Sequence, residues 1–255
     1  MSAGPFCIEE QLTPLLQYGT WTYDSAARDT NRRQIMWETR VLAEFFGVAD
    51  AIGLALPEDT QTLRRIFDDH WIEPLPRWPP SELLSLMALA QHHHLPTRLL
   101  DWTRHHLKAA HFAAYEPAQE KSPQGRLSVW VFDLIQRDLV RGFGAPKLPF
   151  TIITAPAATN LNLRAQEGVF TVGEPIENDD SFVDRRPFDQ MLAELCAQRS
   201  IGSSMPWFYR ITLPKSEARE LSAELGKESI TRATLFPDFY GVVEAMKEAR
   251  LWYSQ

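Results

Sequence analysis

The segment QHHHLPTRLLDWT, residues 91–103, separates two stretches of helical periodicity, and its own pattern decides what lies between them. Pro96 ends the preceding helix, because its ring removes a backbone donor and clashes with the turn before it. The apolar run that follows predicts a short buried strand over residues 97–102. Thr103 has the side chain of an N-cap, which predicts a helix from this point to Tyr115.

Three helices are predicted on the N-terminal side of this segment, over residues 32–52, 60–69 and 81–91. The first repeats apolar side chains every three or four positions, as the buried face of a helix does. The second follows Asp59 and Thr60 and the third begins at Ser81, and the side-chain oxygens of these residues can cap a helix.

Strands and further helices are predicted on the C-terminal side. Residues 126–132, RLSVWVF, are rich in β-branched and aromatic side chains and predict a strand, and a second strand is expected within residues 205–214. Loops and short strands are expected between residues 150 and 172. Two last helices are predicted over residues 216–225 and 238–249.

Helices come first in this order, and scattered strands mixed with helices follow. Such an order predicts an α+β fold. We expect a single domain over residues 31–255, with an N-terminal helical part and a small mixed or antiparallel sheet. Residues 1–30 are expected to be irregular, because prolines and the QYGTW turn interrupt any helix.

Composition limits the classes of function. The net charge of −7 argues against a general nucleic-acid binder, which needs a basic face for phosphates. No apolar run approaches the roughly 20 residues that span a bilayer, so no membrane association is expected. Two cysteines cannot make a disulfide framework, and a cytoplasmic, reduced protein is therefore expected.

Residues 91–103 resemble the signature segment of the FRG-domain family, which contains the same Leu-Pro-Thr-Arg-Leu-Leu-Asp-Trp-Thr order. NLRAQEGVFTV, residues 162–172, is similar to a second family element, and LFPDFYG, residues 235–241, to its closing segment. Two positions depart from the family pattern. The Phe/Tyr-Arg-Gly tripeptide for which the family is named is absent, and His94 stands where the family has Gly.

The order of elements is also similar to the Arg-Ser-Glu layout of ADP-ribosyltransferases. This resemblance implies an ADP-ribosyltransferase-like fold and NAD as a substrate, in a bacterial or phage toxin or defence effector. Thr103 would take the hydroxyl position, and Gln166 or Glu167 the late catalytic position. The first-strand Arg is missing, with Arg28, Arg32 and Arg33 as candidates to replace it. Without it a pyrophosphate loses a bidentate contact.

The remaining candidate site residues are ligand-binding candidates: His92, Thr97, Arg98, Asp101, Trp102 and Arg164. Each also has a structural interpretation. A buried Arg98 or Asp101 must be paired and hydrogen-bonded. Thr97 flanks a backbone break and can serve as a cap, and Trp102 suits a core as well as a stacked base.

A metal site is not expected, although six of the seven histidines lie between residues 92 and 111. No HEXXH pattern is present, and adjacent histidines on a helix point in different directions. Two functions therefore stay open: an ADP-ribosyltransferase-like enzyme, and a non-catalytic module that binds a small nucleotide or a partner. The protein or nucleic-acid target is unknown from the sequence.

Overall fold

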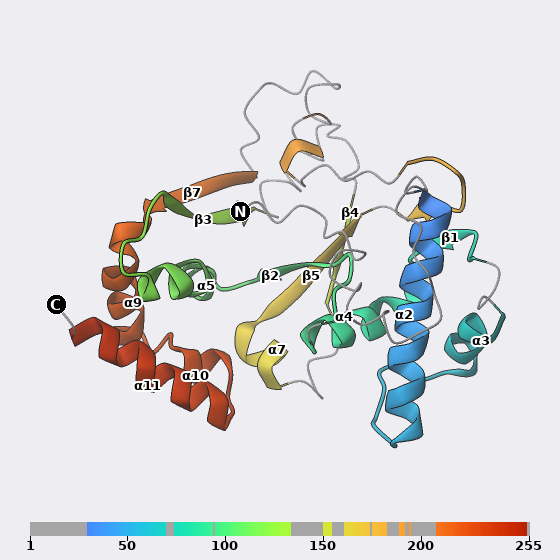
Figure 1. Ribbon diagram of the computed structural model, residues 1–255, viewed down its shortest axis with the longest axis horizontal. Helices are drawn as coiled ribbons and strands as arrows, with labels where there is room; N and C mark the ends of the chain where they lie inside the picture. The colour runs from blue at the N-terminus through green and yellow to red at the C-terminus, as the bar shows by residue number, and fades with distance from the viewer. Residues whose placement is uncertain are drawn as a thin grey trace. The chain divides into compact units, whose positions relative to one another are not determined.

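In the computed structural model, the described residues are 30–69, 74–93, 95–133, 150–154, 161–173, 175–182, 189–191, 194 and 208–253 (Figure 1). They form a mixed α+β fold, with more helix than strand and small sheets whose paired strands are antiparallel. The predicted α+β class and the predicted N-terminal helical part are thus confirmed. The ADP-ribosyltransferase-like fold stays a prediction.

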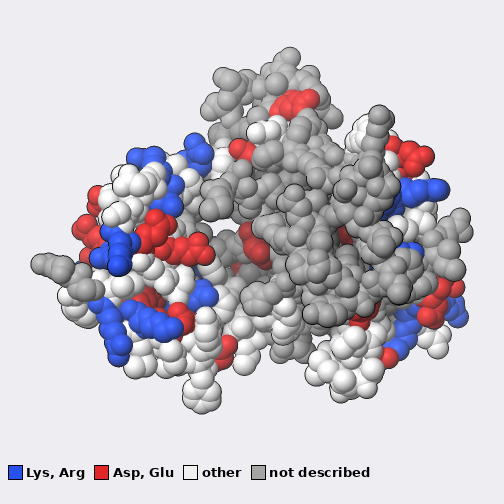
Figure 2. All heavy atoms as spheres, viewed as in Figure 1, with Lys and Arg blue, Asp and Glu red and all other residues white. Residues whose placement is uncertain are grey.

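The chain contains two compact units. Unit 1 comprises Met1–Leu100, Pro149–Pro156 and Phe170–Leu192, and unit 2 comprises Asp101–Leu148, Ala157–Val169 and Ala193–Gln255. Residues 1–29 of the expected irregular segment lie outside the described residues. In Figure 2, acidic and basic side chains are interspersed over the described residues that face the viewer. No helix in the described part of the chain is long and apolar enough to cross a bilayer.

Unit 1 is built on four helical segments: α2 (Asn31–Ala51), α3 (Gln61–Asp69), the short 3-10 turn η1 (Ser81–Leu83) and α4 (Leu84–His92). The first two predicted helices are confirmed within one residue at each end, and the third is confirmed as the 3-10 turn η1 followed by α4, which starts three residues after the predicted start. Their apolar faces meet in a core that includes Ile35, Leu63 and the fully buried Trp78. Burial of such side chains is the main favourable contribution to folding. The helix pattern was therefore readable from the apolar periodicity alone.

The caps of these helices were predicted with mixed success. Thr60 accepts a hydrogen bond from the Leu63 backbone N–H at 3.2 Å, as predicted for a cap of α3. The prediction for Ser81 is wrong, because Pro80 occupies the N-cap position of η1 and no side chain caps that turn. The Ser81 hydroxyl instead donates to its neighbour Glu82.

Two small sheets include residues of unit 1. β1 (Arg77–Trp78) pairs antiparallel with β6 (Ile176–Glu177), and β4 (Phe150–Ile153) pairs antiparallel with β5 (Gly168–Gly173). β2 (Leu100–Thr103) completes a three-stranded sheet in the order β2-β5-β4.

The strand predicted over residues 97–102 begins three residues later than expected, and it is not fully buried, since Asp101 is exposed. The Leu99 backbone N–H donates to the Thr97 hydroxyl at 3.2 Å, so residues 97–99 form a local turn in place of a strand ladder. Thr103 ends β2, and the next helix, α5 (His106–Gln119), has His105 as its N-cap. The prediction of Thr103 as that N-cap is therefore wrong.

Unit 2 contains an antiparallel pair, β3 (Arg126–Phe132) with β7 (Phe208–Pro214), and a group of helices. These helices are α5, α9 (Ala218–Lys227), α10 (Arg232–Leu235) and α11 (Phe239–Tyr253), with the turn η2 (Lys215–Glu217) before α9. Both predicted strands and both predicted C-terminal helices are confirmed. Small side chains, among them Ala114 and Ala218, let α5 and α9 approach closely in the core of this unit.

Two short helices described in unit 2, α7 and α10, were not predicted. α7 (Leu161–Gln166) lies where loops and short strands were expected. It has six residues and buries only Leu163. Fewer than two helical turns carry too little periodicity for the sequence to reveal them. α7 ends directly before the turn at Glu167, which positions several of the candidate residues.

Candidate functional site

The candidate residues fall in both units, and each unit is described by itself. In unit 1, Arg98 forms an ion pair with Glu38 of α2. Its Nε donates to Glu38 Oε2 at 2.8 Å and its Nη2 to Oε1 at 2.5 Å. The Glu38 side chain is only 3% exposed. A carboxylate this deeply buried requires such partners, because the loss of hydration is otherwise uncompensated.

Glu38 accepts further hydrogen bonds from Trp78 Nε1 and from Gln34 Nε2. Of these four hydrogen bonds, one comes from α2 itself, one from β1 and two from Arg98 in the segment after α4. The Arg98 guanidinium is therefore engaged inside unit 1 with a carboxylate that the sequence analysis missed. Glu38 directly follows Trp37 within the apolar pattern of α2. A carboxylate at such a position was the signal in the sequence that could have identified Glu38 as a buried partner.

Thr97 and His92 lie near this pair along the chain. The Thr97 side chain is buried, and its hydroxyl donates to the Gln91 side-chain oxygen. His92 lies in the last turn of α4, with its ring edge-on to that of His93. A cavity of about 10 Å³ borders Glu38 and Thr97. It has room for a water molecule at most, so this part of unit 1 is a packed polar core.

In unit 2 the structure brings Thr103, Gln166 and Glu167 together. The Thr103 hydroxyl donates to the Gln166 carbonyl at 2.7 Å and accepts from the His105 backbone N–H at 3.1 Å. The Arg104 backbone N–H donates to the Glu167 carbonyl at 3.1 Å. We call residues 103–108 together with residues 164–168 the 103/167 junction. It joins the end of β2 to the turn between α7 and β5.

Charge at the 103/167 junction is concentrated on Glu167 and Lys108. Glu167 has a positive φ of 51° and exposes 47% of its side chain. Lys108 Nζ lies 2.8 Å from Glu167 Oε1 and also donates to the Ala165 carbonyl. The hydrogen bond from Lys108 lowers the pKa of Glu167, and the charges of His105 and Arg104 add to the effect. Glu167 is therefore ionised at neutral pH, among basic groups.

The other candidate side chains of unit 2 lie on the elements that meet at this junction or flank it. The Gln166 side chain donates to the Leu235 carbonyl at 3.2 Å. Asp101 is exposed on β2, and Arg164 is exposed on α7. The half-buried ring of Trp102 packs edge-on against Phe132, with 6.4 Å between the ring centroids. Trp102 is thus in contact with the β3 strand.

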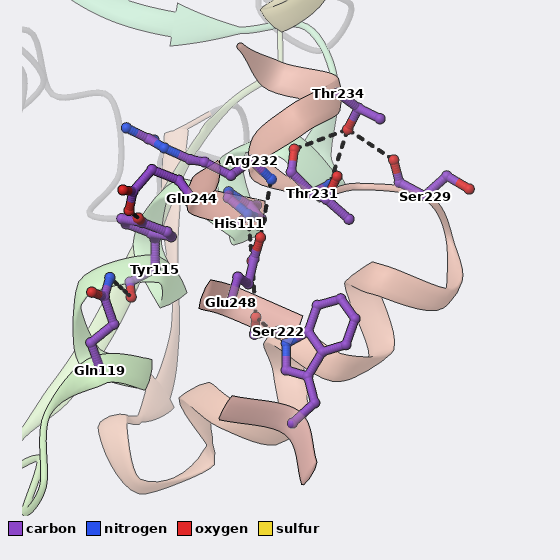
Figure 3. Close-up of polar contacts among 11 residues, drawn as sticks. His111, Tyr115, Gln119, Ser222, Ser229, Thr231, Arg232, Thr234, Glu244 and Glu248 are labelled. Carbon is purple, nitrogen blue, oxygen red and sulfur yellow. Dashed lines mark hydrogen bonds and ion pairs between the residues drawn. The ribbon is translucent and has the colours of Figure 1, made fainter. Parts of the chain in front are cut away.

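Unit 2 also contains a buried polar cluster around Glu248 that the sequence analysis did not identify (Figure 3). His111 Nε2 lies 2.7 Å from Glu248 Oε1, the Ser222 hydroxyl donates to the same oxygen, and the Arg232 backbone N–H donates to Oε2. Both His111 and Glu248 are almost fully buried. Glu248 follows Glu244 by one helical turn on α11, a spacing that could have drawn attention to the pair.

Burial raises the pKa of Glu248, but the hydrogen bonds from His111, Arg232 and Ser222 outweigh burial and leave the pKa below its ordinary value. Nearby, burial and the hydrogen bond to Glu244 raise the pKa of Tyr115 to about 12. The cluster holds α5, α9, α10 and α11 together. Within the described part of the chain, no group of three or more His, Cys, Asp or Glu side chains is arranged to hold a metal ion.

The family model of the FRG domain matches residues 29–122. The match begins just before α2 and includes α3, α4, β2 and α5, and with them the QHHHLPTRLLDWT segment. No curated protein and no solved structure matches the chain. The two other segments that resemble family elements, residues 162–172 and 235–241, lie outside the matched range. The chain is therefore similar to the FRG domain over residues 29–122.

Proposed function

We propose that the 103/167 junction binds NAD and that the protein is an ADP-ribosyltransferase-like enzyme. The observation that carries the proposal is the 2.7 Å hydrogen bond from the Thr103 hydroxyl to the Gln166 carbonyl. It holds side by side two segments that are 63 residues apart, and it places the hydroxyl candidate beside both late candidates. These are the residues that the resemblance to ADP-ribosyltransferases singles out.

The chemistry asked of Glu167 is electrostatic. In the proposed reaction the bond between ribose C1′ and the nicotinamide nitrogen breaks, and its electron pair leaves with nicotinamide. Positive charge then develops on the ribose, until an acceptor nucleophile attacks C1′ and releases its proton. A fixed, ionised carboxylate next to that ribose stabilises such a transition state. The lowered pKa of Glu167 keeps it in the form that this role needs.

The basic groups of the 103/167 junction are the proposed binding site for the pyrophosphate of NAD. Lys108 Nζ lies 2.8 Å from Glu167 Oε1, and the charges of His105 and Arg104 also lower the pKa of Glu167. The same positive charges would attract the pyrophosphate of NAD. In this proposal they would take the place of the missing first-strand Arg. Arg98, by contrast, is already ion-paired with the buried Glu38. Arg28, another candidate for this role, lies outside the described residues.

A second candidate function, a non-catalytic module that binds a nucleotide or a partner, has its own support. The Thr103 hydroxyl and the Gln166 side-chain amide already donate to backbone carbonyls, and Glu167 is already ion-paired with Lys108. Polar groups that are satisfied within the chain build a rigid turn without contributing to chemistry. Under this alternative the junction binds its ligand and releases it unchanged.

The deciding experiment incubates the full chain with NAD labelled on the adenylate, with cell extract as a source of acceptors. Nicotinamide release and label transfer are followed for the wild type and for Glu167→Gln. Loss of an electrostatic contact of this kind lowers turnover by about 10²–10³-fold. Glu120→Gln is the matched control, because Glu120 is 43% exposed and paired with Lys215 much as Glu167 is paired with Lys108.

Each outcome decides between the candidates. Turnover that is lost in Glu167→Gln and kept in Glu120→Gln supports the transferase. NAD binding without nicotinamide release supports the non-catalytic module. The absence of both NAD binding and nicotinamide release contradicts the transferase, and it contradicts a module that binds NAD. Expression of the wild type and of Glu167→Gln in bacteria tests the toxin or defence role, which requires that only the active form slows growth.

A further inference from the structure

A pocket of about 650 Å³ lies between α2 and α3 in unit 1, well away in sequence from the 103/167 junction. Figure 1 shows the two helices side by side. Its described lining includes Phe46 and Gly47 on α2, and Phe67, Asp68 and Asp69 on α3. The volume falls within the range of about 300–1,000 Å³ that small-molecule sites occupy.

The floor of this α2–α3 pocket is aromatic. The Phe46 and Phe67 rings are 5.3 Å apart between centroids, and both side chains are buried. Gly47 leaves the pocket open, because a Cβ atom built on it would meet nothing within 4 Å. Glycine inside a helix costs about 1 kcal/mol relative to alanine. The helix therefore carries an unfavourable residue at the position where a side chain would fill the pocket.

The charge at the pocket is negative. Arg64 is the basic residue of the described lining, and it is already paired with Asp50 at 2.8 Å and with Asp59 at 2.7 Å. The hydrogen bonds that Arg64 donates to both carboxylates raise the pKa of Arg64, and the one to Asp50 lowers the pKa of Asp50. The Arg64 charge is thus compensated before any ligand arrives.

Asp68 and Asp69 give the pocket lining its net negative charge, because Arg64 is already compensated by Asp50 and Asp59. Both are exposed at the end of α3, and neither forms a hydrogen bond or an ion pair with another described residue. The carboxyl end of a helix carries a partial negative charge, which adds to theirs. Phe46 already accepts a guanidinium, since the Arg64 Cζ atom lies 5.1 Å from its ring centroid. An aromatic floor beside free carboxylates attracts a cation and repels an anion.

We infer that the α2–α3 pocket binds a small organic cation, with its apolar body on Phe46 and Phe67 and its ammonium or guanidinium group at Asp68 and Asp69. The site is separate from the proposed NAD site and does not depend on it. NAD carries a negatively charged pyrophosphate, which the carboxylates of this pocket would repel. The protein would thus recognise two ligands of opposite charge.

The first test compares three probes of similar size and different charge on the full chain by titration calorimetry. The probes are the 2-phenylethylammonium ion, neutral 2-phenylethanol and the 3-phenylpropanoate ion. The cation is expected to bind about tenfold more tightly than the alcohol, and the anion more weakly than either. The double variant Asp68→Asn, Asp69→Asn should lower the affinity for the cation to that for the alcohol. Glu44→Gln, on α2 outside the described lining, is the charge control and should bind as the wild type does.

The second test fills the pocket. Gly47→Leu places a side chain in the open space and is expected to abolish binding of the cation while leaving the protein folded, because leucine is the better helix former. Val48→Leu, at the next and exposed position of α2, adds similar bulk outside the pocket and should bind normally. Thermal unfolding confirms that both variants are folded.

Three results would overturn the inference: no heat of binding with the cation up to about 10 mM, equal affinity for the cation and the alcohol, or unchanged binding in Gly47→Leu. None of these results bears on NAD turnover.

Discussion

Arg98 and Glu38 are 60 residues apart in the sequence and form an ion pair with two hydrogen bonds, in which the Glu38 side chain is 3% exposed. Trp78 donates to the same carboxylate. The pair therefore ties the signature segment to α2 and to the β1 strand. A signature Arg that was expected to bind ligand has a structural partner.

Removing one partner of this pair should destabilise the protein strongly. Arg98→Ala is expected to lower the free energy of unfolding by about 3–5 kcal/mol, because it leaves the Glu38 carboxylate buried without its main countercharge. Urea denaturation followed by circular dichroism measures the loss. Arg77→Ala breaks the exposed pair with Glu177, in which both side chains are more than half exposed, and should have a much smaller effect. Equal losses in the two variants would contradict the structural role of Arg98.

The Glu248 cluster should make stability depend on pH. A carboxyl group whose folded pKa is below its ordinary value of 4.5 stabilises the fold above that value. The stabilisation is lost as the pH falls through the lowered folded pKa. Glu248→Gln removes the ionising group, so we expect lower stability at about pH 7 and a smaller further loss towards about pH 3. Thermal unfolding across this range measures both.

Glu228→Gln serves as the matched control, because Glu228 is exposed at the end of α9. It should leave the pH profile of the wild type unchanged. If Glu248→Gln and wild type lose stability in parallel on acidification, Glu248 does not contribute to the pH dependence.

Lys108 should control the ionisation of Glu167. Lys108→Met removes the hydrogen bond that is the largest cause of the lowered pKa, so the pKa of Glu167 should rise towards its ordinary value. Carbon-detected NMR of the glutamate carboxyl groups follows this titration directly. Lys215→Met, which removes the partner of Glu120, should leave the titration of Glu167 as it is. An unchanged Glu167 pKa in Lys108→Met would exclude the ion pair as its cause.

Two glycines should respond to alanine in opposite directions. A Cβ atom on Gly241, near the start of α11, would overlap the backbone carbonyl of Phe236, which cannot move as a side chain can. Gly241→Ala should therefore destabilise the protein by about 2–3 kcal/mol. Gly47→Ala meets open space in α2 and should stabilise it by about 1 kcal/mol. Thermal unfolding separates the two, and a stable Gly241→Ala would contradict the close approach at Phe236.

The sequence by itself determined the elements whose signal is local. Apolar periodicity over residues 32–52 located α2 almost to the residue, and the β-branched run at residues 126–132 located β3. The order of residues in QHHHLPTRLLDWT indicated the similarity to the FRG domain, whose family model matches residues 29–122. Local signals failed where an element was short, as at α7, or where a side chain used its oxygen in a turn, as Thr97 does.

Only the tertiary structure decided which polar groups meet. Arg98 pairs with Glu38, 60 residues earlier in the sequence. The Thr103 hydroxyl donates to the carbonyl of Gln166, 63 residues later, and His111 contacts Glu248, 137 residues later. Periodicity predicts that a position is buried, and burial demands that a charge be paired. Neither states which partner it will find, because that depends on how elements distant in the chain pack against one another.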